Sequence, residues 1–184
     1  EVLVDYLNRN LKRICEYNFE RLKKYFKPRH DVTPRICVKA TYKNNIVELF
    51  RDSAVGYYSS YSIESNTGFK FVRDEGKYYL NNNIPKSYFG GEYINPRLNS
   101  DISAYSKQNE WALFWNSNND VDISSFYKST LIVPMTLSNN QLSDLYRQLT
   151  GIDNEERTIY GFLCIDHVAS DYFNEDSDID IGYI

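Results

Sequence analysis

The expected fold is decided by Tyr127-Lys-Ser-Thr-Leu-Ile-Val-Pro-Met-Thr-Leu137, which is followed after an interruption by Tyr160-Gly-Phe-Leu-Cys-Ile-Asp-His167. Both segments are short, rich in β-branched and aromatic residues, and bounded by turn-forming residues, which is typical of strands. We expect them to pair as antiparallel strands at the centre of a sheet. The acidic run 174–180 follows shortly after and predicts the start of a final helix, because carboxylates favour the positive end of a helix dipole.

The totals favour one globular domain. The chain has 184 residues, a net charge of -4 and 42% hydrophobic residues. This length is typical of a single domain, and the hydrophobic content suffices for one substantial core. The negative charge argues against binding to duplex nucleic acid, which requires a concentrated basic face. We therefore expect a single domain spanning 1–184, with no nucleic-acid duplex among its partners.

The three cysteines, Cys15, Cys37 and Cys164, are far apart and lack the spacing of metal ligands or of a disulfide framework. We expect no metal, no cofactor and a reducing, cytoplasmic environment. The sequence has no apolar run long enough to span a membrane, and it opens at Glu1 without an initiator methionine. It is interpreted as a piece of a longer protein, with an attached effector or membrane segment outside this sequence.

Residues 2–26 repeat apolar side chains at spacings of three and four, which predicts an amphipathic helix that ends before Pro28. The expected apolar stripe comprises Leu3, Leu7, Leu11, Ile14, Leu22 and Tyr25 or Phe26. Two interpretations stay open. The helix covers one face of its own sheet, or the segment 1–27 is a signalling helix that pairs with a second copy in a homodimer.

The next part of the chain predicts a β-hairpin at 35–42 and 46–50, a short helix at 66–75 stopped by Gly76, and a strand at 77–80. In the first strand, Ile36, Val38 and Ala40 alternate with Arg35, Cys37 and Lys39, as in a half-buried strand. The segment 81–122 is rich in Asn, Ser, Gly and Pro. Loops of this length usually serve a ligand or a partner. A helix carrying Leu142, Leu145 and Leu149 is expected between the two central strands.

Two blocks of the sequence resemble a GAF domain. The first is Asn66-Thr-Gly-Phe-Lys-Phe-Val-Arg-Asp-Glu-Gly-Lys77 with Asn81-Asn-Asn-Ile-Pro85, and the second is Ser129–Met135 with Gly161–Asp166 and Phe173. The resemblance implies an α+β fold, with a central antiparallel sheet of about six strands flanked by helices. Residues 35–184 would form the sheet, the lid and the start of the C-terminal helix. Such domains bind a small molecule, often a cyclic nucleotide or a chromophore, or act as dimerising relays.

The resemblance has departures. The Asn-Lys-x-Phe-Asp-Glu signature of many cyclic-nucleotide binders is absent, and no cysteine between 81 and 128 could attach a bilin. Some GAF-like proteins are methionine sulfoxide reductases, which use cysteines clustered in pocket loops. Cys37 and Cys164 instead fall in expected strands and are interpreted as small core hydrophobes, with a redox enzyme as the less favoured alternative.

Catalytic chemistry has little support in the sequence. Asp166 and His167 are neighbours, and neighbours in a strand point to opposite faces. They are interpreted as exposed polar residues at a strand end. We therefore predict that the protein is not an enzyme and has no catalytic residues.

Aromatic residues and one arginine gather in the region that forms the lid in GAF-like folds, where rings could stack a planar ligand and the arginine could neutralise its charge. The expected ligand-binding residues are Tyr88, Phe89, Tyr93, Arg97, Trp111, Trp115, Asn116 and Thr130, with Asn95 and Phe114 beside them. The sequence thus predicts a sensory domain that binds a small molecule, such as a nucleotide second messenger, and regulates an attached effector. The alternative is a ligand-free dimerisation or interaction relay.

Overall fold

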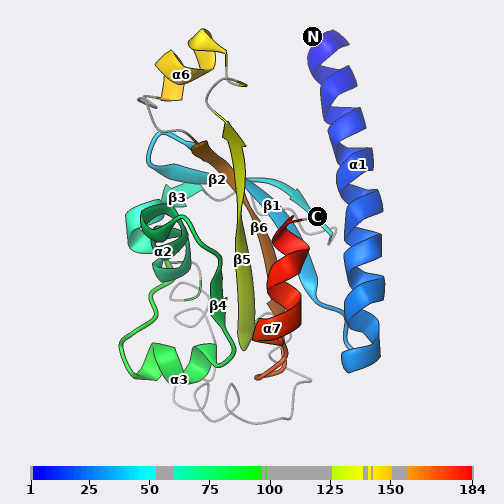
Figure 1. Ribbon diagram of the computed structural model, residues 1–184, viewed down its shortest axis with the longest axis vertical. Coiled ribbons are helices and arrows are strands. Elements are labelled where there is room, and N and C mark those ends of the chain that lie inside the picture. Colours follow the sequence, from blue (N-terminus) through cyan, green and yellow to red (C-terminus); the bar gives the residue numbers. More distant parts are fainter. Residues whose placement is uncertain are drawn as a thin grey trace, which may run out of the picture.

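The computed structural model describes residues 2–52, 60–96, 98, 126–138, 141, 143–150 and 157–183. Its strands form one six-stranded antiparallel sheet in the order β3-β2-β1-β6-β5-β4 (Figure 1). The strands are β1 (Arg35–Tyr42), β2 (Asn45–Arg51), β3 (Ser60–Ser62), β4 (Tyr79–Asn81), β5 (Ser129–Ser138) and β6 (Arg157–His167). The predicted α+β architecture, with helices on both sides of a central antiparallel sheet, is confirmed.

The two segments that decided the expected fold are β5 and β6, which pair along their whole lengths. β6 also pairs with β1, and Gly161 lies opposite Ala40 in that ladder. A Cβ atom at Gly161 would lie 2.5 Å from the carbonyl oxygen of Lys39, which is closer than atoms can approach. Glycine is therefore required for β1 and β6 to lie this close together.

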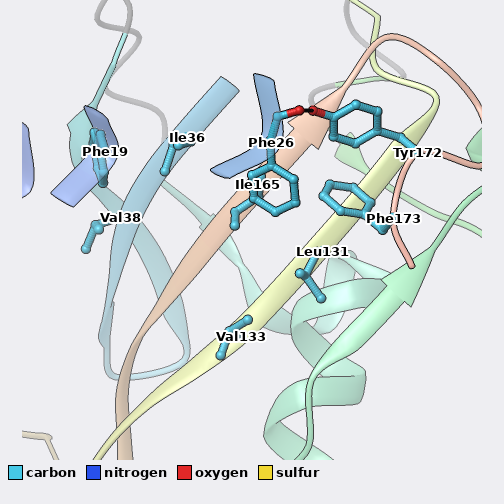
Figure 2. Packing of buried hydrophobic residues seen from close by; sticks show 9 residues of the cluster. All are labelled: Phe19, Phe26, Ile36, Val38, Leu131, Val133, Ile165, Tyr172 and Phe173. Carbon is cyan, nitrogen blue, oxygen red and sulfur yellow. Dashed lines mark hydrogen bonds between the residues drawn. The ribbon is translucent and has the colours of Figure 1, made fainter. Parts of the chain in front are cut away.

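One face of the sheet is covered by α1 (Val2–Phe26) and by the C-terminal segment, which lie on the same side in Figure 1. Figure 2 shows the buried cluster between them: Phe19, Phe26, Ile36, Val38, Leu131, Val133, Ile165, Tyr172 and Phe173. The Tyr172 hydroxyl donates a hydrogen bond to the carbonyl oxygen of Phe26, at 3.3 Å. The end of α1 is thereby joined to the chain that follows β6.

The inward stripe of α1 differs from the expected one. Cys15, Phe19, Leu22 and Phe26 pack toward the sheet, at helical spacings of four, three and four. Ile14, which was expected in the stripe, is 58% exposed, so this assignment was wrong. The side chains of Leu3, Leu7 and Leu11 lie outside the described ones. The part of α1 nearest the sheet thus covers the domain's own core.

The opposite face is covered by α2 (Thr67–Glu75). The helix itself was predicted from its capping residues. The Asn66 side chain accepts a hydrogen bond from the backbone N–H of Phe69, and Gly76 ends the helix with a left-handed φ of 65°. Gly68 lets α2 approach β5, because a Cβ there would lie 2.6 Å from Ile132 Cδ1. The capping pattern and the small residue together fix where this helix lies.

Shorter elements complete the described chain. They are α3 (Ile84–Phe89), α6 (Asp144–Thr150), α7 (Glu175–Asp178) and the 3-10 turns Lys27–Arg29, Ile63–Ser65 and Ile179–Tyr183. α3 lies in the segment 81–122, which was expected to be a loop. The start of this helix is indicated in the sequence by its N-cap Asn83 and by Pro85 in its first turn. α6 lies between β5 and β6, as expected. None of the helices within the described ranges is long and apolar enough to cross a membrane.

Candidate functional site

The sheet face under α2 carries a group of polar and ionisable side chains, which we call the polar site. Its members are Cys37, Lys39, Tyr61, Tyr93, Asn95, Tyr127, Thr130, Cys164 and Asp166. The register explains why they meet: Asp166 lies opposite Arg35 on β1 and opposite Thr130 on β5. Side chains two residues apart on a strand share a face, so Cys164 and Asp166 point the same way.

Asp166 is the acidic member of the polar site. Its Oδ1 accepts a hydrogen bond from the Thr130 hydroxyl at 2.6 Å, which is the one hydrogen bond of this carboxylate within the described ranges. Burial raises the pKa of Asp166 above its ordinary 3.8, and outweighs the opposing effects of that hydrogen bond and of the Lys39 charge. The residue keeps partial exposure. Since a carboxylate can accept several hydrogen bonds, Asp166 retains acceptor capacity for a ligand.

Lys39 is the basic member, and it is only 7% exposed. Its Nζ donates a hydrogen bond to the Tyr61 hydroxyl at 2.9 Å and lies 5.2 Å and 5.3 Å from the ring centroids of Tyr61 and Phe69. Burial by itself would lower the pKa of Lys39, but attraction to Tyr61 and to the two nearby thiols outweighs it and raises the pKa. Lys39 is therefore a fixed positive charge between aromatic rings.

Three polar side chains form a hydrogen-bonded group close to Asp166. The hydroxyls of Tyr93 and Tyr127 are 2.7 Å apart, and the Asn95 amide donates to the Tyr127 hydroxyl at 2.6 Å. Burial raises the pKa of both tyrosines, so both remain neutral phenols. The group therefore offers neutral hydrogen-bond donors and acceptors beside a carboxylate and a buried cation.

The other face of the same strands leads to the chain termini. His167 is 2% exposed and stacks on the Tyr172 ring at 3.5 Å between centroids. Nearby, Asp178 is paired with Arg29, whose Nη2 donates to Oδ1 at 2.6 Å. This contact connects the 3-10 turn that follows α1 to α7. We call Arg29, His167, Tyr172 and Asp178 the terminal junction.

The sequence-predicted site residues fall into three groups. The structure places Tyr93 and Thr130 in the polar site, together with Asn95. Tyr88 and Phe89 are on α3, where Tyr88 packs against a cluster around Ile84 that also contains Tyr93, and Phe89 is 48% exposed. Arg97, Trp111, Phe114, Trp115 and Asn116 lie outside the described residues.

Several members of the polar site were not predicted, and two expectations were wrong. The alternation in β1 was read correctly, but its polar face was expected to meet solvent, whereas Lys39 is buried under aromatic side chains. Asp166 and His167 were expected to be exposed, whereas Asp166 is partly buried and His167 is fully buried. The sequence did contain a signal for the burial of Lys39. Lys39 alternates with apolar residues in a strand, and a sheet that helices cover on both faces also buries the polar side of such a strand.

No model of a known protein family matches the sequence, and no curated protein matches it. The chain is similar in structure to a free methionine-R-sulfoxide reductase from Thermoplasma acidophilum, with a TM-score of 0.49, 9% identity, and coverage of 94% of this chain and 87% of the other. It is also similar to the fRMsr of Staphylococcus aureus in complex with substrate, with a TM-score of 0.46, 10% identity, and coverage of 97% and 88%.

A far-red cyanobacteriochrome photoreceptor is similar as well, with a TM-score of 0.44, 12% identity, and coverage of 98% of this chain and 86% of the other. The six-stranded antiparallel sheet with flanking helices agrees with the expected GAF-like fold. Identities this low concern the fold alone. The prediction that the protein is not an enzyme must be corrected, because the solved structures that it resembles include free methionine-R-sulfoxide reductases. A GAF-like fold is shared by enzymes and by sensory proteins, so it does not exclude catalysis.

Within the described ranges, no group of three or more His, Cys, Asp and Glu side chains could hold a metal ion. The side chains of the polar site supply hydrogen-bonding groups, charge and thiols. A carboxylate of raised pKa, a buried ammonium group and neutral hydroxyls can recognise a polar organic molecule from several sides.

Proposed function

We propose that this GAF-like domain binds a small molecule against the polar site and acts as a sensor. The observation that carries the proposal is the concentration of buried polar groups on one face of the sheet, around Asp166 and Lys39. Burying polar and charged side chains costs stability unless they are satisfied, so a structural core would be better served by apolar residues. Recognition of a polar ligand would explain why these polar and charged side chains are buried on this face of the sheet.

We further propose a nucleotide second messenger as the ligand. Lys39 supplies positive charge for a phosphate group, and the rings of Tyr61 and Tyr93 supply flat surfaces for a base. Asp166 and Asn95 supply an acceptor and a donor for the edge of the base. A neutral metabolite would leave the Lys39 charge without a counterpart in the ligand, which favours an anionic molecule.

The proposed output runs through β6. Asp166 faces the ligand and His167 belongs to the terminal junction, so a shift of this part of β6 would change the contacts that hold α1 and α7 together. A ligand can move such an equilibrium only if it binds one arrangement more tightly than the other. An effector regulated by this domain would read the change in the terminal helices.

We also propose that the domain is a homodimer through the outer face of α1. Ile14 and Tyr17 are 58% and 66% exposed on that face. A ligand-free relay would use the same face, so dimerisation alone does not distinguish the sensor from the relay.

Deletion of residues 1–26 is a poor test of the dimer, because it removes the buried Phe19 and Phe26. The substitutions Ile14→Glu and Tyr17→Glu change the surface alone, and light scattering should show the mass of one chain in place of two.

Ligand binding is tested by native mass spectrometry of the purified protein, followed by thermal unfolding with a panel of cyclic mono- and dinucleotides. We expect at least one of them to raise the melting temperature of the wild type. This ligand-induced increase in melting temperature should be lost in Asp166→Asn. It should be kept in the matched control Asp176→Asn, because Asp176 is exposed on α7, away from the polar site. If no retained molecule and no stabilising nucleotide is found, the ligand-free relay is favoured.

A further inference from the structure

The two buried thiols of the polar site, Cys37 and Cys164, lie directly opposite each other on β1 and β6. Both belong to the buried cluster under α2, so their side chains point to the same face of the sheet. In an antiparallel ladder, directly opposite residues have Cα atoms about 4.5 or 5.5 Å apart, according to the type of pair. Both separations fall within the range that a disulfide spans, about 4.4–6.8 Å. The Cα separation in this register is therefore compatible with a disulfide between the two side chains.

The surroundings make the two thiols unequal. The hydrogen bond with Cys164 lowers the pKa of Cys37; burial opposes this effect, and the positive charge of Lys39 adds to it. Burial raises the pKa of Cys164, which gives the hydrogen bond. An attacking thiolate and a neighbouring protonated thiol are the two parts of a reversible dithiol centre.

The third cysteine does not take part in this arrangement. Cys15 is on α1 and packs against the cluster on the opposite face of the sheet. Burial, with a smaller effect of the neighbouring Glu16, raises the pKa of its thiol. The oxidation chemistry of the polar site therefore concerns Cys37 and Cys164 alone.

We propose that Cys37 and Cys164 form a reversible disulfide in the folded protein when a hydroperoxide enters the polar site. The Cys37 thiolate attacks the outer oxygen of the hydroperoxide, the O–O bond breaks, and Cys37 becomes a sulfenic acid while the leaving alkoxide takes a proton to form an alcohol. The Cys164 sulfur then attacks the Cys37 sulfur, the S–O bond breaks, and the departing hydroxide takes the Cys164 proton to form water. The peroxide oxygen is reduced and the two thiols are oxidised.

The modification site shares the polar site with the proposed ligand, but the oxidation does not require that ligand. The partly exposed Asp166 lies two residues from Cys164 on the same face, so the thiols are close to the part of the polar site that meets solvent. Lys39 is the positioning residue for the reaction, because its charge favours the thiolate of Cys37. Loss of that charge should slow the oxidation without preventing the bond itself.

The test uses the full chain carrying Cys15→Ser, first reduced and then treated with hydrogen peroxide in the absence of any ligand. Tryptic mass mapping should show the peptide Ile36–Lys39 linked to the peptide that begins at Thr158, with the loss of two hydrogen atoms. Dithiothreitol should restore both thiols. In Cys164→Ser the sulfenic acid of Cys37 should persist and react with dimedone. The variant Lys39→Met should form the disulfide several-fold more slowly, and the exposed control Lys77→Met at the wild-type rate.

Two results would overturn the proposal. One is a folded protein that consumes peroxide or loses thiols without any link between the two peptides. The other is a link that forms no faster in the folded chain than in the chain unfolded by urea. Because no ligand is added, a failure of nucleotide binding would leave both results interpretable.

Discussion

Asp166 and His167 are consecutive residues of β6 whose side chains serve opposite faces of the sheet. Asp166 accepts a hydrogen bond from Thr130 in the polar site, and His167 stacks on Tyr172 in the terminal junction. One peptide unit therefore separates the proposed ligand site from the contacts that hold the chain termini. The following predictions test both sides of this strand.

Asp166→Asn should stabilise the ligand-free protein at neutral pH. The folded-state pKa of Asp166 is raised, so stability falls as the pH rises from the ordinary 3.8 to the folded-state value. Each unit of difference costs about 1.4 kcal/mol, and an asparagine avoids that cost while still accepting the bond from Thr130. Urea unfolding should show a gain at neutral pH that disappears below the ordinary pKa. A loss of stability at neutral pH would show that the ionised carboxylate supports the fold.

Arg29→Met should destabilise the protein by about 3 kcal/mol at neutral pH, because it leaves the Asp178 carboxylate buried without its cation. The Asp178 side chain is 1% exposed. Burial would raise its pKa, but hydrogen bonds from Arg29, the Asn174 backbone and Tyr25 together hold the pKa below 3.8. Equilibrium unfolding in urea measures the loss.

The pH dependence of the same variant gives a second measurement. The folded-state pKa of Asp178 is lowered, so the stabilisation is present above the unfolded-state pKa and is lost as the pH falls through the folded-state value. The difference between Arg29→Met and the wild type should therefore be full at neutral pH and shrink in acid. A difference that does not change with pH would mean that the lost packing of Arg29 matters and its charge does not.

Tyr127→Phe should cost about 1–3 kcal/mol, because it removes the hydroxyl that Asn95 and Tyr93 share within a buried group. Tyr42→Phe is the matched control, since Tyr42 is 52% exposed and its change should be close to neutral. Denaturant unfolding of both variants checks the prediction. Equal effects would indicate that water replaces the lost hydroxyl of Tyr127.

Gly161→Ala should destabilise by about 3 kcal/mol, the upper end of the usual cost of overpacking, because the added methyl group meets a backbone oxygen that cannot rotate away. Gly90→Ala is the control: its φ is -73°, and the added atom would lie 3.3 Å from the nearest oxygen. Thermal unfolding should separate the two variants clearly. A tolerated alanine at 161 would show that β1 and β6 can move apart.

Local signals in the sequence predicted the elements that depend on local chemistry. The β-branched and aromatic residues of 127–137 and 160–167 predicted the paired strands β5 and β6, and Asn66 and Gly76 predicted both ends of α2. The helix α3 was missed, although Asn83 and Pro85 are ordinary signals of a helix start. Half of the expected site, from Arg97 to Asn116, lies outside the described residues.

By itself, the sequence determined most of the local elements, because capping, turn chemistry and the period of apolar residues act over a few neighbouring positions. The class of fold followed from its resemblance to a GAF domain. Only the tertiary structure decided that Lys39, Thr130 and Asp166 share one buried face, and that Cys37 and Cys164 are opposite each other. These relationships depend on strand register and on which helix covers which face. Both are set by packing between distant segments, which leaves no periodic trace in the sequence.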